Sequence, residues 1–115
     1  MYKIIVTKNF IDKINSFTVY MKDYYRNIFS NTGIYSEKDI IKAYIKTYEE
    51  LQDSIYLEVE KIANNGLIGR KIIKSEGNLE ISIITFQKRS YSISFYSIKD
   101  SVNKVIEIYD IIIKT

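Results

Sequence analysis

The sequence predicts an α+β domain in which an N-terminal helical hairpin packs on an antiparallel-rich sheet, with the element order β-α-α-β-β-β(-β). Two observations support this prediction. Apolar residues recur at spacings of three and four between residues 10 and 62, which is the period of an amphipathic helix. From residue 70 the period changes to two and turn residues follow at short intervals, as in an antiparallel meander. The 115 residues contain no repeat or linker-like stretch, so we expect a single domain over residues 1–115.

The first two elements are predicted from a β-branched run and an apolar stripe. Residues 2–7, YKIIVT, are short and β-branched, which favours a strand. A stripe then continues through Phe10, Ile14, Phe17, Met21, Tyr24 and Ile28. These positions share one face of a helix, and Thr7 or Asn9 is placed to cap its start.

A second helix is predicted after a break at residues 30–33, SNTG. Ser36 can cap it, with Asp39 in the position of a capping-box acid. Its apolar stripe consists of Ile41, Tyr44, Tyr48, Leu51, Ile55, Val59 and Ile62. Gly66 can adopt the left-handed conformation that ends a helix. At about 1.5 Å per residue this helix is roughly 40 Å long, and the two helices should form an antiparallel hairpin.

Four strands are predicted after the hairpin, and the first strand of the chain should join them in one curved sheet. Their sequences are RKIIKS (residues 70–75), LEISIITF (79–86), YSISFYSI (91–98) and KVIEIYDIII (104–113). In YSISFYSI, alternation places Tyr91, Ile93 and Phe95 towards the core. The serines between them and Tyr96 point the other way, towards plain solvent or a shallow concave surface, and we favour solvent.

The composition excludes several kinds of site. The chain has no cysteine and no histidine, so thiol and zinc-thiolate sites are excluded and any acid–base chemistry must use Lys, Tyr, Asp or Glu. It has no phosphate-binding or nucleophile-elbow motif and no magnesium or calcium ligand spacing, so we expect no metal and no cofactor. No uncharged run reaches the roughly 18 residues of a membrane span, and the N-terminal apolar core is too short for a signal peptide. We therefore expect a cytoplasmic protein that does not bind a membrane.

The net charge of +3 arises in the C-terminal half. Residues 1–65 carry nine basic and nine acidic side chains, whereas residues 66–115 carry eight and five. The basic side chains around the first meander strand and the next turn are Arg70, Lys71, Lys74, Lys88 and Arg89. They are candidates for binding nucleic acid or another target, because Arg and Lys suit phosphate oxygens. The alternative, which we favour, is that they keep turns and edge strands soluble and unpaired.

The chain carries more apolar residues than a small domain with one helical layer needs. Ile111, Ile112 and Ile113 are consecutive, so both faces of the last strand are apolar. The helices also carry apolar residues outside their stripes, among them Tyr20 and Tyr56. A partner chain that covers part of this surface would account for the excess, and a homodimer is one such arrangement.

The element order, the length and the C-terminal strands resemble the RelE/ParE superfamily of toxins from bacterial type II toxin–antitoxin modules, which serve in plasmid stabilization. The local similarity begins at NNGLIGRKI (residues 64–72) and continues through SYSISFYSIKDSVNKVIEIYDII (90–112). The family often ends in Tyr-Arg-Ile-x-Tyr, a short turn with an acidic residue, and then Val/Ile-x-Ile-x-x-Ile. Here Tyr91, Ile93 and Tyr96 lie in the first part of that pattern, Asp100 in the turn, and residues 105–108 in the last part.

The resemblance implies one of two activities. RelE-type members cut ribosome-bound mRNA with basic side chains and often a tyrosine, which would assign catalysis to Lys74, Arg89 and Tyr96. ParE-type members inhibit DNA gyrase without that basic set. In this sequence Ser92 stands where a ribonuclease relative carries arginine, and Tyr109-Asp110 replaces the usual His-Arg. The resemblance therefore favours a non-enzymatic inhibitor over an mRNA endonuclease.

In either case the resemblance implies a partner, an antitoxin encoded next door, whose chain lies along the helices and the sheet. The alternative to a toxin is a non-catalytic binding or accessory domain of phage or plasmid type, which forms homo-oligomers through its helical face.

Overall fold

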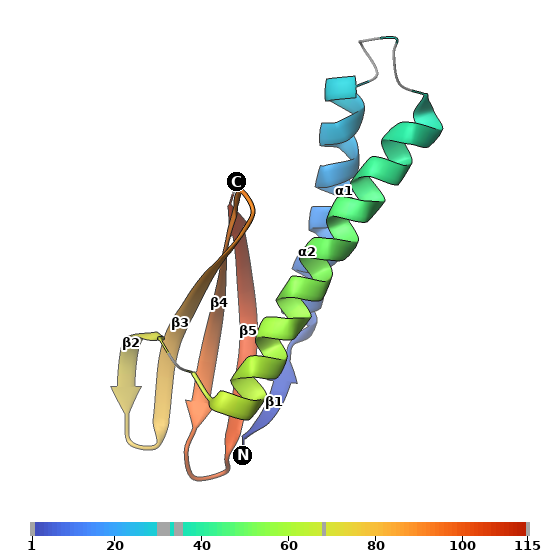
Figure 1. Cartoon of the computed structure of the whole chain (residues 1–115). Helices are drawn as coiled ribbons and strands as arrows, with labels where there is room; N and C mark the ends of the chain where they lie inside the picture. Colours follow the sequence, from blue (N-terminus) through green and yellow to red (C-terminus); the bar gives the residue numbers. More distant parts are fainter. Residues whose placement is uncertain (1, 30–32, 34–35, 68, 115) are drawn as a thin grey trace.

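The computed structural model describes residues 2–29, 33, 36–67 and 69–114, and within them it confirms the α+β class. In this described part of the chain the element order is β-α-α-β-β-β-β (Figure 1). The elements are β1 (Lys3–Val6), α1 (Lys8–Phe29), α2 (Glu37–Asn65), β2 (Lys71–Glu76), β3 (Leu79–Lys88), β4 (Tyr91–Asp100) and β5 (Val105–Lys114). Most of the break predicted at residues 30–33 lies outside the described residues.

The strands form one mixed sheet in the order β1-β5-β4-β3-β2. β1 is parallel to β5, and the other neighbouring strands are antiparallel. The predicted meander is thus confirmed, and the first strand joins it beside the last one. β5 carries one extra residue, Tyr109, between the pairs Ser97–Ile108 and Tyr96–Asp110. β2 has a similar bulge between Ile72 and Lys74, and such bulges bend a strand and increase its twist.

The start of α1 is fixed by polar contacts with β5. The Phe10 N–H donates to Thr7 Oγ1 at 3.3 Å, so Thr7 is the capping residue. Asn9, the other predicted cap, instead donates from Nδ2 to the carbonyl oxygen of Tyr109 at 3.1 Å. Thr7 Oγ1 also donates to that carbonyl oxygen at 3.1 Å. The bulge of β5 therefore holds the first turn of α1 in place.

The ends of α2 are those that the sequence predicts. Ser36 Oγ accepts from the Asp39 N–H at 3.2 Å, as a capping serine does. Gly66 follows the last helical residue with a φ of 72°, and its N–H donates to the Ile62 carbonyl oxygen at 2.8 Å. A positive φ favours glycine, which explains why the helix ends there.

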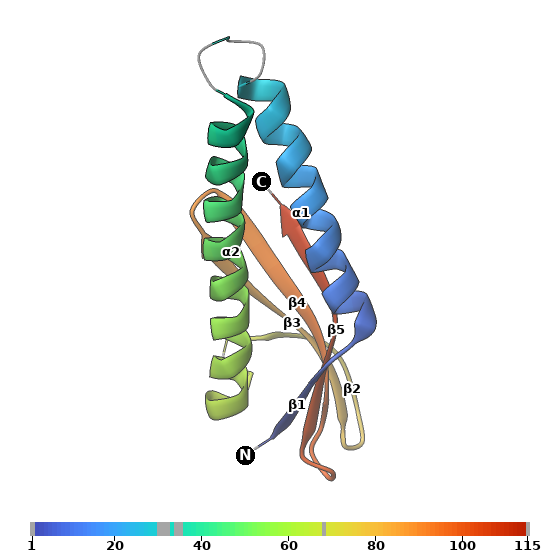
Figure 2. The same ribbon diagram turned by 90° about the vertical axis from the view of Figure 1, so that its right-hand side faces the viewer.

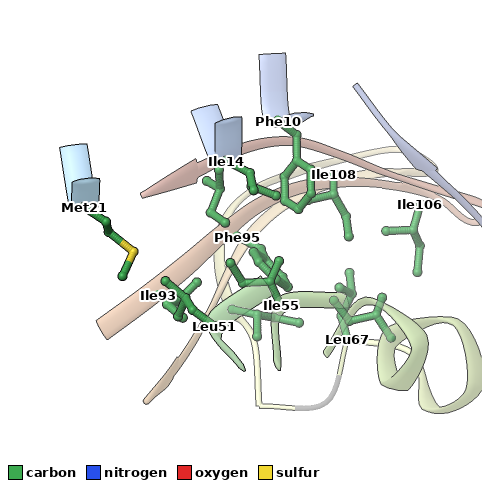
Figure 3. Close-up of a cluster of buried hydrophobic side chains, with 13 residues drawn as sticks. Phe10, Ile14, Met21, Leu51, Ile55, Leu67, Ile93, Phe95, Ile106 and Ile108 are labelled. Carbon is green, nitrogen blue, oxygen red and sulfur yellow. The ribbon is translucent and has the colours of Figure 1, made fainter. Parts of the chain in front are cut away.

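Both helices lie on one face of the sheet, and the core forms between the two layers (Figures 1 and 2). Figure 3 shows helix side chains from α1 and α2 directed at strand side chains from β4 and β5. The buried core residues are Phe10, Ile14, Met21, Leu51, Ile55, Ile62, Leu67, Ile84, Ile93, Phe95, Ile106, Ile108 and Ile111. Phe95 lies at the centre, with ring centroids 5.6 Å from Phe10 and 5.3 Å from Phe86. The predicted inward orientation of Ile93 and Phe95 is confirmed, since both are fully buried.

The helical hairpin extends beyond the end of the sheet (Figure 1). The Thr7 N–H donates to the Ile108 carbonyl oxygen at 3.1 Å, so α1 begins beside the middle of β5. The part of β5 that follows, residues 109–114, spans only about 20 Å. The 22 residues of α1 span about 33 Å, so its last turns pass the sheet. The molecule accordingly measures 59 × 23 × 22 Å, and its radius of gyration is 17.0 Å, against roughly 13 Å for a compact domain of about 100 residues.

The overhang changes the expected burial of the first helix. Phe10 and Ile14 are buried, whereas Tyr24 and Ile28, on the same stripe, are 51% and 43% exposed. The sheet ends before it reaches them. No described helix is long and apolar enough to cross a membrane.

Candidate functional site

The sheet presents one face that points away from both helices, which we call the outer face (Figure 1). Because side chains alternate along a strand, the register of the sheet determines which of them lie there. Two neighbouring rows cross its middle. The isoleucine row consists of Lys74, Ile81, Ile98, Glu107 and, on the edge strand β1, Ile5. The tyrosine row consists of Lys71, Ile83, Tyr96 and Tyr109.

The tyrosine row depends on the bulge in β5. The rings of Tyr96 and Tyr109 lie side by side, with centroids 6.2 Å apart. The predicted outward orientation of Tyr96 is thus confirmed. Sequence reasoning did not place Tyr109 on this face, although the adjacent Tyr109-Asp110 pair interrupts the apolar alternation of the last strand, which is a signal for a bulge.

Towards the β3–β4 turn, the outer face carries polar side chains of β3 and β4 that pair with each other, and Ile112 of β5 lies beside them. The Thr85 and Ser94 hydroxyls lie 2.9 Å apart, and Gln87 Nε2 donates to Ser92 Oγ at 3.2 Å. The predicted serine side of β4 is therefore present. Ser92, which stands where the resembling ribonucleases carry arginine, bonds to its neighbour across the strands.

A hollow of about 420 Å³ lies at one side of the isoleucine row. It is lined by Lys74, Glu76, Leu79, Ile81 and Ile98. Its apolar side chains supply contact area, and Lys74 Nζ lies 3.7 Å from Glu76 Oε2, so its lysine is already paired. The volume is that of a small-molecule pocket, but such sites also hold several converging polar groups, and this lining supplies only one ion pair.

Arg70 is not free to bind a target. Its guanidinium pairs with Glu80 through two hydrogen bonds, one of them from Nη2 to Oε2 at 3.2 Å. Nη1 donates to the Leu67 carbonyl oxygen at 3.2 Å. The hydrogen bond raises the pKa of Arg70 and lowers the pKa of the Glu80 carboxyl. Arg70 therefore joins the end of the helical hairpin to β3.

Lys88 and Arg89 lie at the other end of β3 from Lys74. Lys88 is opposite Tyr91 on the helix side of the sheet and borders a small hollow with Leu57 and Glu58 of α2. Arg89 is in the turn, with a φ of 55°, and its guanidinium pairs with Glu50 of α2.

The structure thus divides the predicted basic cluster. Lys71 pairs with Ile83, five residues from Lys88 along β3, a separation of about 17 Å. Of the three catalytic candidates, Lys74 and Tyr96 share the outer face in neighbouring rows, whereas Arg89 contacts α2.

The groups with shifted pKa values belong to structural contacts. The Asp110 pKa is lowered because the Lys13 ammonium lies 2.6 Å from its carboxylate. Burial and nearby tyrosine hydroxyls raise the pKa of Tyr91, whose ring packs on Phe17 with centroids 5.7 Å apart. Catalytic acids and bases usually show such shifts inside a cleft, and these two lie between α1 and the sheet instead. Among the described residues no three His, Cys, Asp or Glu are grouped to hold a metal ion.

A second exposed surface lies on the overhang, which we call the hairpin stripe and define as Tyr20, Tyr24 and Ile28. Tyr20 and Tyr24 are each 51% exposed, and their rings stack with centroids 6.2 Å apart. Tyr20 also stacks on Phe17, which is partly buried against the core, at 5.6 Å. The stripe is therefore a continuation of the core into solvent.

Comparison with protein-family models, with curated proteins and with solved structures finds no match to this chain. The outer face and the hairpin stripe are accordingly interpreted from their own chemistry.

Proposed function

We propose that this chain is a toxin-like component of a type II toxin–antitoxin module, of the RelE/ParE kind. It binds its target, DNA gyrase or RNA on the ribosome, and a small antitoxin protein neutralises it. The observation that carries the proposal is the hairpin stripe, an apolar surface that the described strands do not cover.

The hairpin stripe is suited to a protein partner. Over the first half of α1 the sheet covers the apolar stripe, and beyond its end Tyr24 and Ile28 remain about half exposed. Contiguous exposed apolar surface of this kind is typical of protein interaction sites. Tyrosines are favoured there because they bury a large ring and keep the hydroxyl in water. A partner segment along the overhang would continue the layer that the sheet provides lower down.

Binding without catalysis is supported by the composition of the outer face. Lys74 and Tyr96 share it, but the predicted third group, Arg89, pairs with Glu50 at the end of the sheet. A general acid and a general base must both reach the same substrate atoms. Position 92 does open onto the outer face, and its side chain is a serine bonded to Gln87. We therefore propose a non-enzymatic inhibitor.

The proposal is tested by controlled expression in a bacterial host. We expect the chain alone to arrest growth, and co-expression of the small protein encoded next to it to restore growth. Harmless expression together with no binding to that neighbour would contradict the proposal.

A pair of variants in α1 tests the role of the hairpin stripe. Tyr24→Asp places a charge in the stripe and should weaken antitoxin binding at least about tenfold, so that growth arrest persists during co-expression. Val19→Asp is the matched control, because Val19 is 61% exposed and lies on another side of the same helix. Equal loss of binding in both variants would show that the stripe is not the contact.

The alternative is a non-catalytic accessory domain that forms homo-oligomers through its helical face. The same hairpin stripe favours it, since a second copy could cover the exposed tyrosines. This alternative predicts harmless expression and self-association that Tyr24→Asp abolishes.

A further inference from the structure

The outer face is more apolar at its centre than a solvent-facing sheet requires. Open antiparallel sheets usually place polar side chains on the face that contacts water. Here the centre of the isoleucine and tyrosine rows is formed by Ile81, Ile98, Ile83 and Tyr96, with Tyr109 beside them. Leu79 extends this surface and is 46% exposed. Lys71, Lys74 and Glu107 flank this centre, and the hydroxyl and amide side chains of β3 and β4 lie towards the β3–β4 turn.

Over the four strands β2 to β5, the two rows are self-complementary about a line between β3 and β4. In the isoleucine row, Ile81 and Ile98 lie on either side of this line, Lys74 follows Ile81 on β2, and Glu107 follows Ile98 on β5. A half-turn about an axis along this line exchanges β3 with β4 and β2 with β5. Over β2 to β5 the row is therefore apolar at its centre, with a basic residue on one side and an acidic residue on the other, and Ile5 of β1 follows Glu107 at the edge of the sheet.

We propose that a second copy of this chain packs on the outer face, sheet against sheet, about a two-fold axis that runs between β3 and β4. Ile81 then contacts Ile98 of the second copy, and Lys74 meets Glu107 of the second copy, each contact occurring twice. In the tyrosine row, Ile83 meets Tyr96 and Lys71 meets the ring of Tyr109, a suitable cation–π pair. Face-to-face sheets lie about 10 Å apart and can be rotated by about 30°, which the twist of this sheet allows.

The size of the outer face suits such a dimer. The four long or edge strands β2 to β5 cover about 20 Å at roughly 4.8 Å spacing, and the ten-residue strands are about 33 Å long. Because β2 has only six residues, the face is about 570 Å² per copy, which lets a dimer bury slightly more than the ~1,000 Å² in total expected of a biological interface. The polar Thr85–Ser94 and Gln87–Ser92 pairs would form its rim towards the turn.

Charge reversal at the ends of the isoleucine row tests the proposal by sedimentation equilibrium of the full chain. Wild-type protein should dimerise in the micromolar range. Lys74→Glu and Glu107→Lys, each alone, place like charges opposite each other twice and should raise the dimer dissociation constant at least about tenfold. The double variant Lys74→Glu/Glu107→Lys exchanges the charges and should restore dimerisation to within about threefold of wild type.

Two controls separate this dimer from other associations. Lys42→Glu makes the same charge change on an exposed part of α2 and should leave the dimer intact. Tyr24→Asp should also leave it intact, since the hairpin stripe is remote from the outer face. Three results would each overturn the proposal. The wild-type chain could stay monomeric at a few hundred micromolar, or both single charge reversals could leave the dimer unaffected. The third is a double variant that stays monomeric although circular dichroism shows that it is folded. It does not depend on the proposed toxin function, because growth arrest and dimerisation are measured separately.

Discussion

The two faces of the sheet are formed by alternate residues of the same strands, and they differ in what lies against them. On the inner face Ile93 and Phe95 contact the helices and are fully buried. On the outer face their neighbours along β3 and β4, such as Ile83 and Tyr96, are apolar too and have no helix over them. The difference shows that strands with apolar side chains on both faces carry more apolar surface than one layer of helices can bury. The surplus is therefore available for association.

The largest expected effect separates adjacent residues of β4. Phe95→Ala should lower the free energy of unfolding by about 3–5 kcal/mol, because it leaves a cavity between α1 and the sheet. Tyr96→Ala should cost less than about 1 kcal/mol, since its ring rests on the open face. Urea denaturation followed by circular dichroism measures both, in the Lys74→Glu background so that self-association does not contribute. Similar losses for the two variants would remove the distinction between the faces.

A fully buried pair of serines on the inner face gives the next largest effect. Ser82 and Ser97 are fully buried there, and their hydroxyl oxygens lie 3.0 Å apart. Ser97→Ala removes the partner of the Ser82 hydroxyl and should cost about 1–3 kcal/mol.

The double variant Ser82→Ala/Ser97→Ala should recover most of that loss, because no buried hydroxyl is then left unpaired. The double-mutant cycle is measured by denaturation at one pH and salt concentration. Additive losses in the double variant would mean that the two hydroxyls are not coupled.

The sequence is sufficient to predict the parts of this fold that depend on local chemistry. Ser36 and Gly66 end α2 because of a side-chain acceptor and a positive φ, and the alternation in β4 determines its inner side. The overhang depends on where α1 begins relative to β5, which is a tertiary contact between Thr7 and Ile108. The predicted second helix, at roughly 40 Å, is nevertheless longer than the ten-residue strands, at about 33 Å, and this difference indicates that the helical layer extends past the sheet.

The candidate site is less predictable from the sequence than the fold. Alternation along β4 predicts that Tyr96 points outward, and the register confirms it, whereas the position of Lys74 on the same face depends on the pairing of β2 with β3. The distance of Lys88 and Arg89 from the other basic residues could not be read from the sequence, because it depends on how β2 pairs with β3, which separates the two groups along its length. Glu107 was not identified either, since its significance depends on sharing a row with Lys74 across four strands.

The smallest expected effect concerns the charged turn at the end of the outer face. The Asp100 carboxylate accepts from the Val102 and Asn103 N–H groups at 3.0 and 3.1 Å, and from Asn103 and Asn78 side chains. These hydrogen bonds, those from Asn103 foremost, lower its pKa from 3.8 to about 2. A carboxyl with a lowered pKa stabilises the fold above its unfolded pKa, and this contribution is lost as the pH falls towards 2.

Wild type and Asp100→Asn should accordingly differ in stability at pH 5 and converge as the pH approaches 2, because the variant lacks the titrating group. The other lowered carboxyls, Glu80 and Asp110, are present in both proteins and cancel in the comparison. An NMR titration of the Asp100 carboxyl carbon provides the direct measurement, with a midpoint near 2 expected. A midpoint near 3.8, or a stability difference that does not change between pH 5 and pH 2, would mean that the turn does not hold the charged form. The effect is small because this carboxylate lies in solvent, where water screens its interactions.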